Sequence, residues 1–183
     1  MTGEVEIGID VGIYGRLADP ENVLGLARFA EERGYHSIWL ADHVVFPTAI
    51  ESKYPYSPSG AFPVAGSEPL LEPIAAMGVL VGATQRIKIG TAVHVLPLGN
   101  PLRIAEEAAT VDQISQGRFE FGVGRSGLPG AYEGYNISYA ESRERFYECH
   151  DLLIKAWTEP GPFRWEGKHY HFRVVNPWVL PIQ

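Results

Sequence analysis

The sequence lacks the features that mark secreted, membrane-spanning and nucleic-acid-binding proteins. Its 183 residues include a single cysteine, Cys149, so no intrachain disulfide can form and the thiol is interpreted as a packing residue. No apolar run is long enough to span a bilayer, and the N-terminus carries acidic residues where a signal peptide needs a basic region. The formal net charge is −7, and basic residues form no run. We therefore expect a cytoplasmic protein with neither nucleic acid nor a membrane as its partner.

Hydrophobic residues make up 45% of the chain and follow alternating strand and helix patterns. Short β-branched runs predict strands, and apolar periods that begin at a capping residue predict helices. The predicted strands cover 5–11, 37–41, 87–95 and 118–123, and the predicted helices cover 20–34, 69–83, 101–117 and 138–157. Ser138 and Glu141 form the pattern of a capping box for the last helix. A β-hairpin over 163–172, turning at Glu166-Gly167, follows it.

This order of elements predicts an α/β fold with a parallel sheet covered by helices. Doubly wound sheets and (β/α)8 barrels share the pattern, so periodicity alone leaves both open. A complete barrel typically needs about 250 residues, which is more than this chain contains. In either fold, functional residues gather at the C-terminal ends of the strands.

Polar residues follow the second, third and fourth predicted strands. Asp42-His43 is the most reactive pair, because a histidine can exchange a proton near neutral pH and an adjacent acid can bind a ligand donor. A polar loop histidine beside a turn aspartate explains the same pair equally well. Ala92-Val93-His94 and Gly124-Arg125-Ser126-Gly127 end the next two strands. His94 alternates away from Val93 and is predicted to be a hydrogen-bonded interior histidine.

The segment from Gly122 to Gly127 matches the G-x-G-x-x-G pattern of dinucleotide-binding sites. Such a site requires a helix that opens inside the motif, whereas the next helix is predicted to begin near Ser138. The motif is therefore interpreted either as a glycine-rich turn or as a place where a flat ring or a phosphate approaches the backbone closely.

Several other polar and aromatic residues are interpreted as structural. His169 and His171 form an H-x-H pair without a third ligand, so no metal site is expected. The pairs Glu31-Glu32 and Glu106-Glu107 are predicted to lie on solvated helix faces. The long loop over 46–66 could cover a substrate or pack onto the body of the protein through its aromatic residues, Tyr54, Tyr56 and Phe62.

Stretches along nearly the whole chain resemble one enzyme family. The segment Ile38-Trp39-Leu40-Ala41-Asp42-His43 resembles the second strand of luciferase-like monooxygenases, and the segment from Ile87 to Val93 resembles their third. The stretch from Asn100 to Gly124 is similar to their third helix and fourth strand. Three short segments also fall where that family has them: Trp157-Thr158, Trp165-Glu166-Gly167 and Pro181-Ile182-Gln183.

The resemblance implies an α/β fold, the N-terminal portion of a TIM (β/α)8 barrel with about four βα units plus a β-hairpin. Residues 1–183 would form one luciferase-like domain, truncated before the fifth barrel strand. Because a sheet of four parallel strands leaves two open edges, the expected partner is either a missing C-terminal half or a second copy in a homodimer.

The resemblance also implies an oxidoreductase that acts on a small-molecule substrate. The segments from Asp42 to Pro47 and from Tyr54 to Ser57 are similar to a subgroup that uses the deazaflavin coenzyme F420, which implies hydride transfer with that coenzyme. One alternative is an FMN-dependent monooxygenase of the same family. The other is a non-catalytic truncated half-barrel that binds a cofactor or dimerises.

Finally, the resemblance assigns roles to residues. It places Asp42 and His43 beside the redox ring, with His43 as the catalytic acid/base and Asp42 orienting the cofactor or the histidine. It gives Ala92-Val93 a non-proline cis peptide bond behind the ring. It lines the cofactor with Gly124, Arg125, Ser126 and Gly127, although Arg125-Ser126-Gly127 departs from the glycine-rich or Glu-containing versions common in the family.

Overall fold

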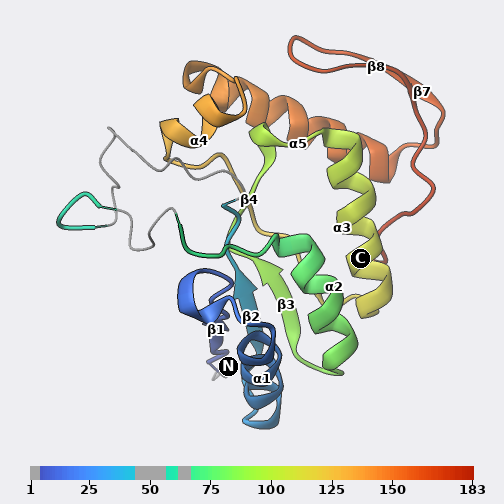
Figure 1. Cartoon of the computed structure of the whole chain (residues 1–183). Coiled ribbons are helices and arrows are strands. Elements are labelled where there is room, and N and C mark those ends of the chain that lie inside the picture. The colour runs from blue at the N-terminus through green and yellow to red at the C-terminus, as the bar shows by residue number, and fades with distance from the viewer. Residues whose placement is uncertain (1–4, 44–56, 62–66) are drawn as a thin grey trace.

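The computed structural model describes residues 5–43, 57–61 and 67–183, and a four-stranded parallel sheet lies at its centre (Figure 1). The strands of this sheet lie in the order β1 (Gly8–Asp10), β2 (Ser37–Leu40), β3 (Lys88–Thr91) and β5 (Phe119–Glu120). Two strand pairs accompany it: β4 (His94–Val95) lies parallel to β6 (Val123–Gly124), and β7 (Phe163–Glu166) lies antiparallel to β8 (His171–Val175). The predicted α/β class and the hairpin are thus confirmed.

The predicted third and fourth strands are each interrupted once. After Thr91 the chain passes through a cis peptide bond between Ala92 and Val93 and then pairs again as β4. Residues 121–122 separate β5 from β6 in the same way. The carbonyl oxygen of Gly122 joins the two interruptions, because it accepts the Thr91 hydroxyl at 2.7 Å and the His94 amide at 2.8 Å. The expected cis bond is confirmed, whereas the prediction of one continuous strand over 87–95 and another over 118–123 is wrong.

Helices connect the strands, and the first three start in the same way. They are α1 (Pro20–Glu32), α2 (Pro73–Ala83) and α3 (Pro101–Ser115). The side chains of Asp19, Glu72 and Asn100 accept backbone N–H groups of the first turn, and a proline follows each of them. Because Glu72 supplies this cap, α2 begins four residues later than position 69, where the sequence predicted it. No helix in the described part of the chain is long and apolar enough to cross a membrane.

The region after the glycine motif differs from the prediction. A short helix, α4 (Pro129–Gly134), begins beyond the motif, and α5 (Ser142–Thr158) follows. The Ser138 side chain makes no capping hydrogen bond, so the predicted capping box is wrong. A 3-10 turn, η3 (Tyr139–Glu141), precedes α5 at this point. The chain forms two other 3-10 turns, η1 (Gly15–Leu17) and η2 (Leu96–Leu98). Since α4 does not open inside the motif, the argument against a dinucleotide site still holds.

Two hydrophobic clusters hold the elements together. In the first, alternate residues of the sheet, including Ile38, Leu40 and Ile89, are fully buried among side chains of α1, α2 and α3. In the second, α5 packs against α3, η2 and the hairpin through residues such as Cys149 and Tyr170. Cys149 is fully buried in this cluster, which confirms it as a packing residue, and burial raises the pKa of its thiol to about 12.

The opposite face of the sheet is more polar. We call it the inner face; it carries Gly8, Asp10, Ser37, Trp39, Lys88, Gly90 and Glu120, which are register partners across the strands. The Trp39 ring lies over two glycines, since a Cβ atom would sit 2.6 Å from the ring at Gly8 and 2.5 Å from it at Gly90. Lys88 and Glu120 form an ion pair whose side chains remain 42% and 38% exposed. This face is therefore only partly covered by the described residues.

Two glutamates on helices hold neighbouring turns. Glu31 of α1 accepts the backbone amides of residues 85–87 at 2.6–3.0 Å, and Glu148 of α5 accepts the amides of residues 168–170 at 2.9–3.1 Å. Burial raises the pKa of each carboxyl, but the hydrogen bonds outweigh burial and leave both pKa values lowered. The prediction that Glu31 lies on a merely solvated face is therefore wrong.

Candidate active site

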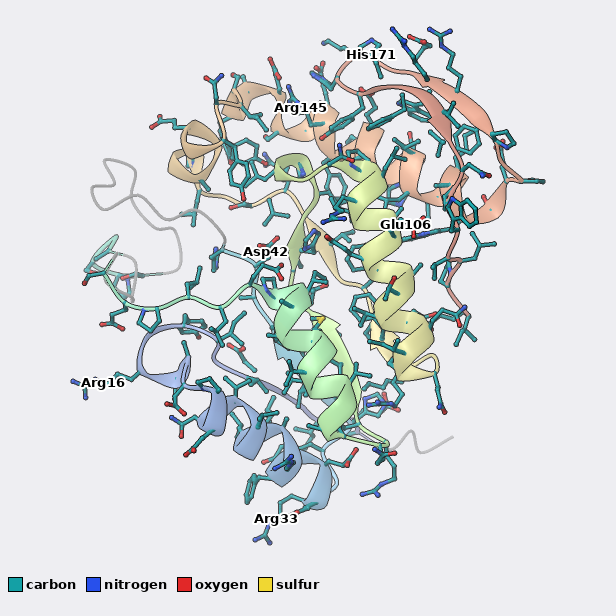
Figure 2. The ribbon with its side chains drawn as sticks, turned by 45° about the vertical axis from the view of Figure 1, so that its right-hand side comes forward. Arg16, Arg33, Asp42, Glu106, Arg145 and His171 are labelled. Carbon is teal, nitrogen blue, oxygen red and sulfur yellow. The ribbon has the colours of Figure 1, made fainter. Side chains whose placement is uncertain are left out.

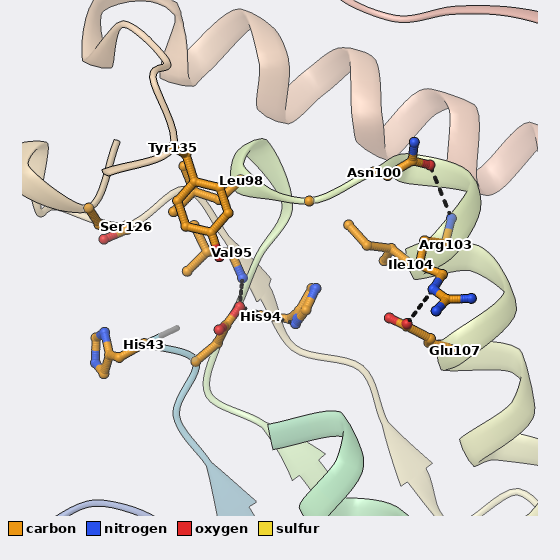
Figure 3. A pocket seen from close by; sticks show the side chains of 13 residues that line it. His43, His94, Val95, Leu98, Asn100, Arg103, Ile104, Glu107, Ser126 and Tyr135 are labelled. Atoms are coloured by element: carbon orange, nitrogen blue, oxygen red, sulfur yellow. Dashed lines mark hydrogen bonds and ion pairs between the residues drawn. The ribbon is translucent and has the colours of Figure 1, made fainter. Parts of the chain in front are cut away.

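A cavity of about 140 Å³ opens where the strands end (Figure 3). Its walls come from the residues after β2, from β4 and η2, from the first turns of α3, and from the chain around α4. Three of the predicted site residues, Asp42, His43 and Ser126, line it. The other lining residues are His94, Val95, Leu98, Gly99, Asn100, Arg103, Ile104, Glu107, Ala131 and Tyr135.

Asp42 is a buried residue of this cavity wall, with 7% of its surface exposed. One carboxylate oxygen, Oδ2, accepts the backbone N–H of Val95 at 2.8 Å and so ties the end of β2 to β4. The same oxygen lies 3.2 Å from Nδ1 of His94, which is ion-pair distance. Asp42 is therefore held by β4 and faces His94, whereas the sequence pattern paired it with its neighbour His43.

His43 follows Asp42 directly in the chain and also lines the cavity. Burial lowers the pKa of its imidazole, and the nearby charge of Asp42 opposes part of this effect. The lowered pKa keeps His43 neutral at pH 7, which is the form that can accept a proton. An acid/base role requires a neutral form that can accept a proton, and that role of His43 stays a prediction.

The wall formed by α3 is polar, which the sequence pattern did not suggest. Arg103 and Glu107 form an ion pair at 3.0 Å, one turn apart on this helix. Burial raises the pKa of Glu107, and Arg103 opposes that effect. Glu106 accepts the backbone N–H of Trp178 at 2.9 Å. Neither glutamate therefore lies on a merely solvated face, and that prediction is corrected.

The glycine motif contributes less to the cavity than expected. A Cβ atom at Gly122 would sit 2.1 Å from the Thr91 carbonyl oxygen, and one at Gly124 would sit 2.5 Å from the Val93 side chain. These two glycines are therefore required by packing between the chain's own strands. Arg125 donates to Ser142 of α5 at 3.0 Å. Its guanidinium thus reaches α5, and within this motif it is Ser126 that lines the cavity.

The remaining predicted residues lie outside the cavity wall or outside the described structure. Ala92, Val93 and Gly127 are exposed, and none of them lines the cavity. His169 lies against two glutamates of the α5 region, with Nε2 3.2 Å from Glu144. No group of three potential metal ligands occurs among the described residues. The aromatic residues of the long loop, Tyr54, Tyr56 and Phe62, lie outside the described residues.

Sequence reasoning missed His94 as a cavity residue, along with the wall contributed by Asn100, Glu107 and Tyr135. A signal for the α3 residues was present, because the capped start of a helix that directly follows a strand end faces the same side as that strand end. Burial raises the pKa of Tyr135, and the charges of Asp42 and Glu72 add to this rise. The phenol therefore stays neutral and can serve as a hydrogen-bond donor.

Comparison with known proteins gives one consistent family. The chain matches the family model described as luciferase-like monooxygenase over residues 5–183. It is 30% identical over 158 residues to an uncharacterized protein of Mycobacterium tuberculosis, covering 86% of this chain and 54% of that protein. It is 31% identical over 156 residues to the alkanal monooxygenase alpha chain of Photorhabdus luminescens, covering 85% of this chain and 37% of that protein.

Solved structures agree on the fold. An F420-dependent secondary alcohol dehydrogenase in complex with an F420-acetone adduct matches with a TM-score of 0.77 and 20% identity, over 99% of this chain and 50% of that chain. The chain thus spans about half or less of the length of these three proteins, and its fold is that of a partial TIM barrel. Because the family model covers almost every residue, this chain belongs to the luciferase-like monooxygenase family.

Proposed function

We propose that this chain forms the part of an F420-dependent oxidoreductase that holds the cofactor ring and the substrate. The observation that carries the proposal is the cavity at the strand ends, where Asp42 and His43 lie together on one wall. Strand ends are where parallel α/β enzymes place their chemistry. The substrate would be a small organic molecule.

The residues around the cavity suit a flat ring with one polar edge. Val93 does not line the cavity, but it precedes the cavity residue His94, is 40% exposed and packs against Gly124, so the chain after β3 offers an apolar surface. Asp42, His43 and Ser126 supply polar groups near it. A deazaflavin bound there would supply hydride transfer, and the protein would supply orientation and a proton.

His43 is the proposed acid/base. A neutral imidazole can take the proton of a substrate hydroxyl on a ring nitrogen and return it in the reverse reaction. The lowered pKa of His43 keeps that nitrogen available near pH 7.

An FMN-dependent monooxygenase is the second candidate. The observation that favours a monooxygenase is the 31% identity over 156 residues to an alkanal monooxygenase alpha chain. The site residues named above would face either ring, because both cofactors present a flat tricyclic system.

We further propose that activity requires a second set of strands, either from a C-terminal half or from another copy of the chain. The partly exposed Lys88–Glu120 pair on the inner face supports this, because side chains that point into a closed barrel are normally covered by those of the other strands. The coverage of about half of the related proteins supports it as well.

Fluorescence titration of the purified chain with F420 and, separately, with FMN tests the proposal. We expect saturable binding of F420, with binding of FMN at least tenfold weaker. Tighter binding of FMN would favour the monooxygenase. If neither cofactor bound saturably, the result would contradict the proposal and favour a non-catalytic half-barrel that only dimerises. His171→Ala is the matched control for substitution of the cavity histidine His43, because Figure 2 shows His171 on the hairpin, away from Asp42. Its cofactor binding should equal that of the unchanged chain.

A further inference from the structure

The hydroxyl group of Tyr135 belongs to the cavity wall and has no hydrogen-bond partner among the described residues. Tyr135 follows α4 and lines the cavity, and Figure 3 shows its ring pointing toward Val95. Its oxygen is also not one of the fully enclosed polar atoms that lack a partner in the described part of the chain. Tyrosine hydroxyls that are withdrawn from bulk water usually find a partner, so this one is open to a ligand.

The backbone around Tyr135 is anchored, so its ring is held in place. The Tyr135 amide donates to the carbonyl oxygen of Tyr132 at 3.1 Å, and the Ile137 amide donates to the same oxygen at 3.0 Å. Tyr132 is fully buried, and its own hydroxyl donates to the Arg125 carbonyl oxygen. A donor that is positioned before the ligand arrives loses little freedom on binding.

Ser126 supplies a second hydroxyl near α4. It precedes this helix and lines the cavity, and its oxygen accepts the Leu128 amide at 3.2 Å, which leaves its hydrogen free to be donated. The φ angle of Ser126 is 60°, a left-handed conformation that glycine adopts more readily than serine. The cavity wall around α4 therefore offers two hydroxyl hydrogens, which bind acceptor atoms.

Negative charges act on the Tyr135 hydroxyl. Burial raises the pKa of this phenol, and the charges of Asp42 and Glu72 raise it further. Arg103, which also lines the cavity, is paired with Glu107 at 3.0 Å. The carboxylates would repel an anionic oxygen placed against the hydroxyl, whereas they act much less on a neutral oxygen. The acceptor that suits this position is therefore uncharged.

We propose that Tyr135 is a specificity-determining residue whose hydroxyl donates a hydrogen bond to a neutral oxygen atom of the ligand bound in the cavity. The site would then favour an uncharged oxygen compound over a hydrocarbon of the same shape and over a carboxylate. Tyr135 holds the oxygen, and His43 keeps the proton transfer. Calling this ligand the substrate rests on the proposed function; the contact between Tyr135 and the oxygen does not.

Equilibrium binding of three probes to the whole chain, without any coenzyme, tests the contact. Cyclohexanone carries the neutral oxygen, methylenecyclohexane has the same shape without it, and cyclohexanecarboxylate carries a charge. Ligand-observed nuclear magnetic resonance measures each Kd. In Tyr135→Phe, the Kd of cyclohexanone should rise about tenfold, which is the usual effect of losing one hydrogen bond in a binding site. The Kd of methylenecyclohexane should change by less than about twofold, because the ring surface is kept.

Tyr147→Phe is the matched control, because Tyr147 lies on α5, is 52% exposed and does not line the cavity. It should leave all three Kd values unchanged. The proposal is overturned if cyclohexanone does not bind the wild type, or if Tyr135→Phe weakens both uncharged probes equally or neither of them. Cyclohexanecarboxylate that binds as tightly as cyclohexanone would overturn the preference for a neutral oxygen.

A measurement on the wild type covers the case in which Tyr135→Phe does not fold. In the chain labelled with 13C at tyrosine Cζ, cyclohexanone should shift the signal of one tyrosine, and methylenecyclohexane should not. Equal shifts with both probes, or none, would overturn the contact. Titration with F420 and FMN is a separate experiment, so a chain that binds neither coenzyme but shows the Tyr135-dependent ketone binding would contradict the proposed function alone.

Discussion

The hydroxyl of Thr91 donates to the carbonyl oxygen of Gly122 across 31 residues, at a distance of 2.7 Å. The contact brings the ends of β3 and β5 so close that residue 122 has no room for a side chain. A Cβ atom there would sit 2.1 Å from the Thr91 carbonyl oxygen, which is backbone and cannot rotate away.

Gly122→Ala should therefore destabilise the protein by about 2–4 kcal/mol, because the two strand ends must separate to admit the methyl group. Chemical denaturation measures this change. Gly78→Ala is the matched control, since a Cβ atom at Gly78 meets nothing within 4 Å and alanine favours the helix. Equal stability of the two variants would show that the strand ends are less closely packed than described.

Arg118 should be a main determinant of stability at the other end of the sheet. Its guanidinium donates to the carbonyls of Ser115, Ile87, Val81 and Thr84 and to the Thr84 hydroxyl, at 2.9–3.3 Å. Lysine cannot reproduce this planar set of bonds, so Arg118→Lys should cost about 2–4 kcal/mol. Thermal unfolding measures the effect, with the exposed Arg16→Lys as control. A loss no larger than that of the control would contradict this role.

Glu31 should make stability depend on pH in the acid range. Its pKa is lowered in the folded protein from an ordinary value of 4.5, so its contribution is present above that pH and is lost as the pH falls through the folded pKa. Glu31→Gln should lower stability at pH 7 and flatten its decline below about pH 4.5. Urea denaturation across pH 3–7 measures both effects. Glu32→Gln, one residue along and exposed, should retain the wild-type slope.

His43→Ala should retain cofactor binding and lose turnover by about 10²–10⁴-fold, because an acid/base group supplies a factor of that size. Single-turnover kinetics and cofactor titration separate the two effects. An equal loss in Asp42→Ala and in the double variant would show that the two residues act as a unit. Unchanged turnover in His43→Ala would remove the histidine from the proposed mechanism.

The isolated chain should bind cofactor weakly and associate with itself. Among the described strands of the main sheet, β1 and β5 lie at the edges, and such edges expose backbone groups that favour pairing. Sedimentation velocity and cofactor titration on one sample measure both properties. A stable monomer that binds cofactor tightly and with one-to-one stoichiometry would contradict the proposal that further strands are required.

Much of the fold follows from local chemistry that is legible in the sequence. Asp19-Pro20 and Asn100-Pro101 mark the starts of α1 and α3, because a capping side chain and a proline act within a single turn. The hairpin also follows from its own residues. Strand interruptions were not predictable in this way, since the break after β5 depends on the contact of Gly122 with Thr91 on a different strand.

The candidate site was predictable only in part for a similar reason. Asp42 and His43 could be found because reactive residue types at the end of a predicted strand can be recognised from the sequence alone. The partner of Asp42 is not visible, because His94 lies 52 residues along the chain and the alternation used to orient it does not continue through the interruption between β3 and β4. Its burial was predicted correctly, whereas its place in the cavity wall was not.

Trp39 gives the inner face an optical property of its own. Its indole rests on the floor formed by Gly8 and Gly90 and donates to Ser37 at 2.9 Å, so its orientation is fixed while its surface is only partly covered. Indole emission moves to shorter wavelengths when water leaves the ring. Any partner that covers this face, whether from the same polypeptide or from another, would therefore shift the emission of Trp39 to shorter wavelengths, and no added label is needed to detect this.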